Sequence, residues 1–86
     1  MNQDQIISTI NHFLAEEFEA DASTFTPEAN MKETLDLDSL DFVDLVVLIE
    51  KNFGFKMAGE ELTKLSSFQD LYNYVSERVL QTTFAG

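Results

Sequence analysis

One serine is placed so that its hydroxyl could carry a phosphate ester. Ser39 directly follows Asp38 and precedes Leu40 and Asp41, where a stretch without helical periodicity gives way to a strongly apolar segment. If a helix begins here, its first backbone N–H groups are unpaired, and the positive end of its dipole favours a phosphate by roughly 0.3–1 kcal/mol. The competing interpretation is that Ser39 is an ordinary helix cap.

The segment after Ser39 has more apolar surface than one core can bury. A stripe at helical spacing that would face inward contains Phe42, Leu45, Val46, Ile49 and Phe53. A second stripe, on another face, contains Leu40, Val43 and Val47. Residues 36–50 also hold five acids and no base: Asp36, Asp38, Asp41, Asp44 and Glu50. An apolar stripe framed by charges of one sign is typical of a docking surface. The same stripe would be core if the helix were central.

The composition limits the partners that this chain can bind. Its 86 residues include 16 acids against five Lys or Arg, which gives a formal net charge of −11. Such a field repels phosphate backbones and anionic headgroups, so we expect a basic partner protein, no nucleic acid and no membrane insertion. The lack of cysteine excludes disulfides and thiolate metal sites. The first residues lack a signal-peptide pattern, and we expect a cytoplasmic protein.

The hydrophobic periodicity predicts a single all-α domain over residues 1–86. Helices are expected at about residues 4–18, 39–53, 59–65 and 67–80. The second has the clearest ends, because Asp38 can cap its start and Gly54 can adopt the left-handed conformation after its last turn. We expect a long loop over 19–38, with at most a short helical turn at Thr26-Pro27-Glu28, and a frayed tail over 82–86. The product is a small bundle of three main helices and one short helix.

A calcium site is the first chemistry that competes with a modified serine. Asp36-Leu37-Asp38 is similar to the start of an EF-hand loop. The register fails, however, because Asp41 stands where the loop needs glycine and Val47 stands where it needs a bidentate glutamate. We expect no dedicated metal site.

An enzyme is the second competitor, with Ser39 as nucleophile and His12, the only histidine, as base. Such a pair needs a third orienting group and oxyanion donors in a cleft, and a short helical chain has little room for them. We therefore expect that the protein is not an enzyme.

Several connected motifs resemble the acyl carrier protein family. They are Leu37-Asp38-Ser39-Leu40-Asp41, Val43-Asp44-Leu45-Val46 and Ile49-Glu50-Lys51-Asn52-Phe53-Gly54. The resemblance covers nearly the whole chain, including the amphipathic first helix, the long loop and the last helix. It implies an acyl-carrier-like bundle in which Ser39 receives 4'-phosphopantetheine from coenzyme A and acyl groups are carried as thioesters on that arm.

The resemblance also implies roles for other residues. Partner recognition would fall to Asp38, Leu40, Asp41, Val43, Asp44, Val47 and Glu50. The acyl chain would fold back between helices against Phe42, Val46, Ile49, Leu62, Leu71 and Tyr74. The implied partners are a phosphopantetheinyl transferase, acyl-loading enzymes, ketosynthases and other enzymes with basic docking patches. The protein would act as a monomer in fatty-acid, polyketide or related lipid biosynthesis.

Three positions depart from the commonest pattern of that family. Asp36 stands where glycine is usual, Lys51 replaces a frequent acid, and Ala58 replaces a frequent proline. A reversed charge on the docking helix should alter which basic surfaces it accepts. The alternative function is a non-covalent acidic adaptor that binds a basic partner without modification.

Overall fold

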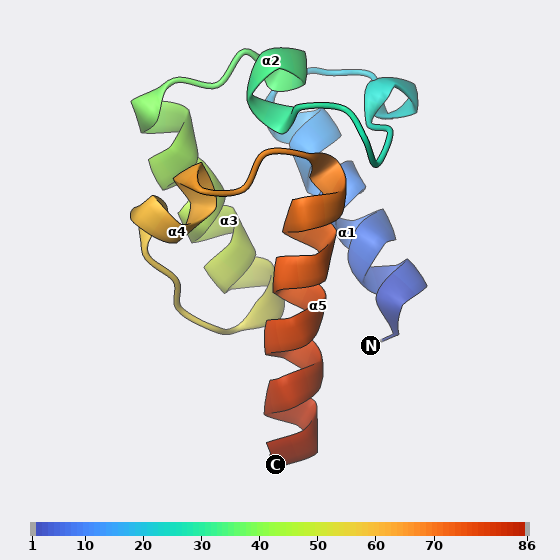
Figure 1. Ribbon diagram of the computed structural model, residues 1–86, viewed down its shortest axis with the longest axis vertical. Coiled ribbons are helices and arrows are strands. Elements are labelled where there is room, and N and C mark those ends of the chain that lie inside the picture. Colours follow the sequence, from blue (N-terminus) through green and yellow to red (C-terminus); the bar gives the residue numbers. More distant parts are fainter. Residues whose placement is uncertain (1, 86) are drawn as a thin grey trace.

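The fold was analysed in a computed structural model, which describes the backbone of residues 2–85 and the side chains of residues 2–79. The elements in chain order are α1 (Gln3–Glu17), η1 (Ala22–Thr24), α2 (Met31–Leu35), α3 (Ser39–Phe53), α4 (Gly59–Thr63) and α5 (Phe68–Ala85). Figure 1 shows α1, α3 and α5 as the long helices, with α2 across one end and α4 beside α3. The predicted all-α fold class is confirmed, since residues 2–85 contain no β-strand.

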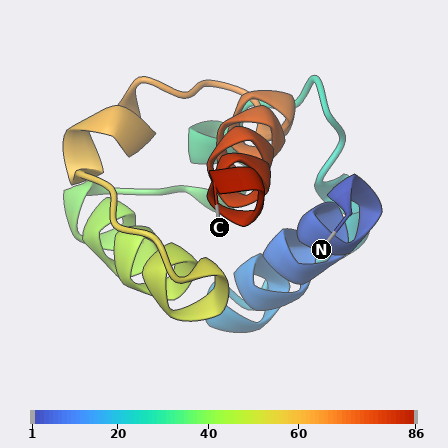
Figure 2. The same ribbon diagram turned by 90° about the horizontal axis from the view of Figure 1, so that it is seen from below.

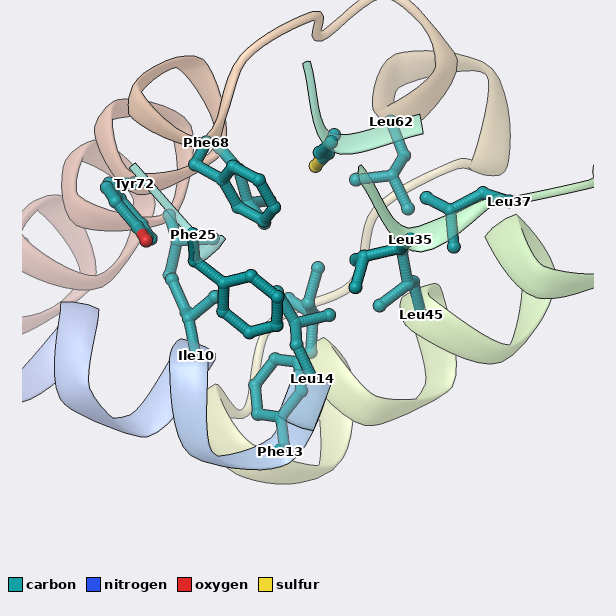
Figure 3. Packing of buried hydrophobic residues seen from close by; sticks show 14 of the residues in the cluster. Ile10, Phe13, Leu14, Phe25, Leu35, Leu37, Leu45, Leu62, Phe68 and Tyr72 are labelled. Atoms are coloured by element: carbon teal, nitrogen blue, oxygen red, sulfur yellow. The ribbon is translucent and has the colours of Figure 1, made fainter. Parts of the chain in front are cut away.

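The core lies among the three long helices and is closed at one end by α2 and the segments around it. Seen along the bundle, α1, α3 and α5 surround a common interior (Figure 2). Figure 3 shows Phe25, Phe68 and Tyr72 on one side of the packed cluster and Leu35, Leu37 and Leu45 on the other. The rings of Phe25 and Phe68 stack with centroids 4.9 Å apart, which fastens the segment before α2 to the start of α5.

The region 19–38, expected to be a loop, contains two short helices. η1 begins after Asp21, whose side chain accepts from Ser23 N, and α2 begins after Asn30, whose side chain accepts from Glu33 N at 2.9 Å. At Thr26-Pro27-Glu28, where at most a short helical turn was expected, the chain forms a turn in which the Ala29 N–H donates to the Thr26 carbonyl at 3.0 Å. A helix as short as α2 has too few residues to show a period, and its stability comes from tertiary contacts.

Those contacts join α2 to the segment before α5. Met31 is fully buried, and its backbone N–H donates to the Ser66 carbonyl at 2.9 Å. In return, Phe68 N–H donates to the Ala29 carbonyl at 3.2 Å. The residues that lead into the predicted site are therefore held by backbone hydrogen bonds.

Two other boundaries differ from the sequence expectation. α4 ends at Thr63 rather than near 65, with Lys64 in the helical conformation as its cap. α5 continues through Ala85, although a frayed tail was expected over 82–86. No glycine or proline interrupts residues 82–85, so helical hydrogen bonding continues there. Gly86 lies outside the described residues.

Candidate functional site

Ser39 is the first residue of α3, and it does not cap the helix. Asp38 does so: its Oδ1 accepts from the backbone N–H of Leu40 at 2.9 Å and of Asp41 at 3.0 Å. The Asp41 carboxylate completes a capping box by accepting from the Asp38 N–H at 3.0 Å. Ser39 is exposed, and no side chain in the described part of the chain hydrogen-bonds its hydroxyl. The capping role that competed with modification therefore belongs to Asp38.

A tight turn connects α2 to the start of α3, where Ser39 lies. The Lys32 carbonyl accepts from the Asp36 N–H and, at 3.0 Å, from the Leu37 N–H. Asp36 is left-handed, with φ 54°, which favours glycine because a Cβ crowds the backbone there. Leu35 and Leu37 are buried on either side of it. The short connection from α2 to Asp38 is thus anchored by side-chain burial as well as by hydrogen bonds.

A cavity of about 390 Å³ opens beside Ser39, which is the size of a small-ligand site. We call it the Ser39 cavity. It is formed by α2, the first turns of α3, and α4, and its lining residues are Lys32, Asp38, Ser39, Phe42, Val43, Gly59 and Thr63. An exposed serine that shares a cavity with the start of a long helix fits the phosphopantetheine group suggested by the sequence.

Of the six residues expected to line an acyl pocket, only Phe42 lines the Ser39 cavity. Ile49, Leu62 and Leu71 are fully buried in the core. Val46 is half-buried against that core, and Tyr74 is half-buried with its hydroxyl bonded to Glu61. The sequence did not identify Lys32, Gly59 and Thr63, because they come from short helices whose placement depends on tertiary contacts.

The two apolar stripes of α3 have different environments. The inward stripe supplies Phe42, Leu45 and Ile49 to the core, while Val46 and Phe53 are half-buried. The second stripe, which we call the docking stripe, is exposed: the exposed fraction is 77% for Leu40, 59% for Val43 and 54% for Val47. The docking stripe is therefore not core. Among the acids around it, Asp38 is exposed, while Asp41, Asp44 and Glu50 are half-buried.

The acidic surface extends beyond α3 to the end of α1. The Glu17 carboxyl, when protonated, can donate to the Asp44 carboxylate, and this contact, with repulsion from Asp44 and Asp41, raises the pKa of Glu17. Sequence reasoning missed Glu17, because no spacing along the chain places the end of α1 beside the middle of α3. Acidic side chains of α1 and α3 thus lie close enough to repel one another.

An enzyme built on Ser39 and His12, a metal site or a membrane span would each require its own feature in the structure. His12 is exposed on α1, and its Nε2 lies 3.3 Å from Oε1 of Glu16. Among residues 2–85, no group of three His, Cys, Asp or Glu side chains is arranged to hold a metal ion. Within the same described stretch, no helix is both long and apolar enough to cross a membrane.

Comparisons with known proteins find relatives over most of the chain. A family model described as the phosphopantetheine attachment site matches residues 8–75. The acyl carrier protein of Thermosynechococcus vestitus is 34% identical over 79 residues, which is 92% of this chain and 98% of the relative. That of Rubrobacter xylanophilus is 35% identical over 77 residues, covering 90% and 95% of the two chains.

The fold is shared with a solved structure. The acyl carrier protein from Enterococcus faecalis superposes with a TM-score of 0.75 at 21% identity, over 90% of this chain and 98% of the other. At that identity the likeness supports the fold, whereas the family model and the sequence relatives support the family. The chain therefore belongs to the acyl carrier protein family, and it contains the phosphopantetheine attachment domain of that family.

Proposed function

We propose that Ser39 is the attachment point of 4'-phosphopantetheine and that the protein carries acyl groups on this arm. The observation that carries the proposal is that Ser39 is exposed at the first position of α3 and lines a cavity. Its hydroxyl is not needed to cap the helix, because Asp38 does so. Modification would join the Ser39 oxygen to phosphorus and break the pyrophosphate bond of coenzyme A. Adenosine bisphosphate would leave, and the hydroxyl proton would pass to a base of the transferase.

The residues around Ser39 position the arm. When bound, the group supplies a thiol that holds acyl chains as thioesters. The N-terminus of α3 presents the positive end of its dipole to the phosphate. Phe42 and Val43 supply apolar wall to the Ser39 cavity, where part of the arm or its cargo is sheltered from water. In this proposal, bond-making belongs to partner enzymes.

We assign partner recognition to the docking stripe and to the acids around it. Leu40, Val43 and Val47 are exposed apolar side chains, and a partner that covers them would release the water around them. Asp38, Asp41, Asp44 and Glu50 would steer a basic patch toward them. The partners in this proposal are a phosphopantetheinyl transferase, acyl-loading enzymes and ketosynthases of fatty-acid, polyketide or related lipid biosynthesis, with a monomeric carrier in the cytoplasm.

Intact-mass analysis tests the attachment site. Apo wild type, Ser39→Ala and Ser66→Ala are incubated with coenzyme A and a phosphopantetheinyl transferase of broad specificity. Ser66 is a matched control, because it is an exposed serine near the start of a helix. Wild type and Ser66→Ala should gain the mass of one phosphopantetheine, and Ser39→Ala should gain none while it melts like wild type.

Two results would reject this assignment. A modified Ser39→Ala would place the arm elsewhere. An unmodified wild type, under conditions that load a control carrier, would favour the non-covalent acidic adaptor. In that case the docking stripe would remain as a binding surface without covalent chemistry.

A further inference from the structure

Lys32 of α2 lines the Ser39 cavity together with Asp38 and Ser39 at the start of α3. The chain has five Lys or Arg in all, and Lys32 is the one that lines this cavity. Its side chain is exposed, and within residues 2–79 no carboxylate lies within 4.0 Å of its ammonium. The cavity that Ser39 lines is thus also lined by a cation that has no ion-pair partner in the described part of the chain.

The backbone of Lys32 is held in place. Its carbonyl accepts the two N–H groups of Asp36 and Leu37, and it follows Met31, which is fully buried. Figure 1 shows α2 at the same end of the bundle as the first turn of α3. The main chain is anchored, while the flexible stem of Lys32 lets its ammonium change position at the Ser39 cavity.

The charges around Ser39 make a cation useful there. Asp36, Asp38 and Asp41 all lie within three residues of it, and a phosphodiester would add one more negative charge. The dipole of α3 opposes this repulsion only partly, since Asp38 already occupies the N–H groups of Leu40 and Asp41. An ammonium is a strong phosphate partner and acts as a point charge that needs no fixed fork geometry.

We propose that Lys32 binds the phosphate of the group carried by Ser39 and directs the first atoms of the arm into the Ser39 cavity. This inference rests on the proposed function and names a positioning residue for it. The other anion that could reach Lys32 is a carboxylate at the end of an acyl cargo. The phosphate is favoured, because its phosphorus would be bonded directly to the Ser39 oxygen, whereas a cargo carboxylate would be a full arm length away.

The test compares apo and holo forms of four proteins: wild type, Lys32→Gln, Lys32→Arg and Lys51→Gln. Lys51 is the matched control, because it stands near the other end of α3, about 18 Å along the helix axis from Ser39 at 1.5 Å per residue. That separation exceeds the screening length of about 8–10 Å near physiological salt. Loading is first verified by intact mass, and the readouts are the melting temperature and the ³¹P chemical shift of the holo protein.

The expected result is a loss specific to Lys32. At low salt, attachment of the arm should lower the melting temperature more, or raise it less, in Lys32→Gln than in wild type. Added NaCl should remove this difference. The ³¹P shift should move in Lys32→Gln and stay close to wild type in Lys32→Arg. Lys51→Gln should match wild type in both readouts.

Other outcomes separate the two proposals. A wild type that loads normally, with equal apo-to-holo changes in wild type and Lys32→Gln at low salt, would overturn the role of Lys32 and leave Ser39 as the attachment site. A wild type that does not load would overturn both. The holo proteins are also charged with a neutral and with a carboxyl-terminated acyl group. A Lys32 effect that appears only with the carboxyl-terminated cargo would assign Lys32 to the cargo and overturn the phosphate contact.

Discussion

The hydroxyl of Tyr74 on α5 donates a 2.8 Å hydrogen bond to Oε2 of Glu61 on α4. The same carboxylate oxygen accepts from the Ala58 N–H at 3.2 Å, at the start of that short helix. The Arg78 guanidinium lies 5.5 Å from the Tyr74 ring centroid and donates to the Lys56 carbonyl at 3.0 Å. These contacts fasten α4, which forms one wall of the Ser39 cavity, to the long helix α5.

Tyr74→Phe should loosen α4 in a pH-dependent way. The Tyr74 hydrogen bond, followed by the Ala58 N–H, holds the pKa of Glu61 below its ordinary value. A carboxyl whose folded pKa is depressed stabilises the fold above its unfolded pKa, and this contribution is lost as pH falls through the folded pKa. The variant should therefore melt a few degrees lower at neutral pH and approach wild type in acid.

Carboxyl NMR titration checks the cause of that change, since the pKa of Glu61 should rise in Tyr74→Phe. Tyr72→Phe is the control on the same helix. It removes the hydrogen bond from Tyr72 to Asn11 on α1, so it should lower stability without moving the pKa of Glu61. A pKa of Glu61 that is unchanged in Tyr74→Phe would contradict the assigned contact.

Glu17→Gln should stabilise the protein at neutral pH. The pKa of Glu17 is raised by its hydrogen bond to Asp44 and by repulsion, so the folded state holds this proton to higher pH than the unfolded state. Stability then decreases as pH rises through that interval, and the amide removes the decrease. Thermal unfolding across pH should show a gain at pH 7 that disappears in acid. Glu28→Gln, an equal charge change on an exposed residue, should show a smaller gain at pH 7.

The acids and the apolar residues of α3 should affect different steps of association. Asp44→Lys should slow transfer to Ser39 about tenfold or more at low salt and less at high salt, because long-range steering is screened. Val47→Ala should slow it modestly at both, since Val47 contributes only after contact excludes water. Glu77→Lys, the same charge change on an exposed residue of α5, is the control. An unchanged rate in Asp44→Lys at low salt would mean that the acids of α3 face solvent without steering a partner.

Two left-handed positions should respond oppositely to substitution. Gly54 has φ 78°, so Gly54→Ala should cost about 1 kcal/mol and lower the melting temperature by roughly 4–8 °C. Asp36 has φ 54°, so Asp36→Gly should relieve strain and raise the melting temperature by a few degrees. Gly59→Ala is the control, because Gly59 has no positive φ and an added Cβ meets no atom within 4 Å. Equal losses in Gly54→Ala and Gly59→Ala would contradict this account.

Local signals in the sequence determined where α3 begins and ends, and they placed Ser39 at its first position. Asp38, with the backbone N–H groups two and three residues later, and Gly54, with its left-handed φ, act within one turn of the chain. They therefore mark the ends of the helix through residues that are close in sequence. The spacing of apolar residues along the sequence also separated the docking stripe, Leu40, Val43 and Val47, from the inward stripe. This is possible because the faces of a helix follow from its 3.6-residue repeat.

Tertiary structure decided what surrounds the serine. α2 and η1 are too short to show a period, and they are held by backbone bonds from Met31 to Ser66 and from Phe68 to Ala29, which join segments far apart in sequence. For the same reason Lys32 and Thr63 line the Ser39 cavity, while Leu71 lies in the core. Capping and periodicity depend on residues a few positions apart, so the sequence expresses them directly. A cavity wall depends on which distant segments pack together, and only the folded chain determines that.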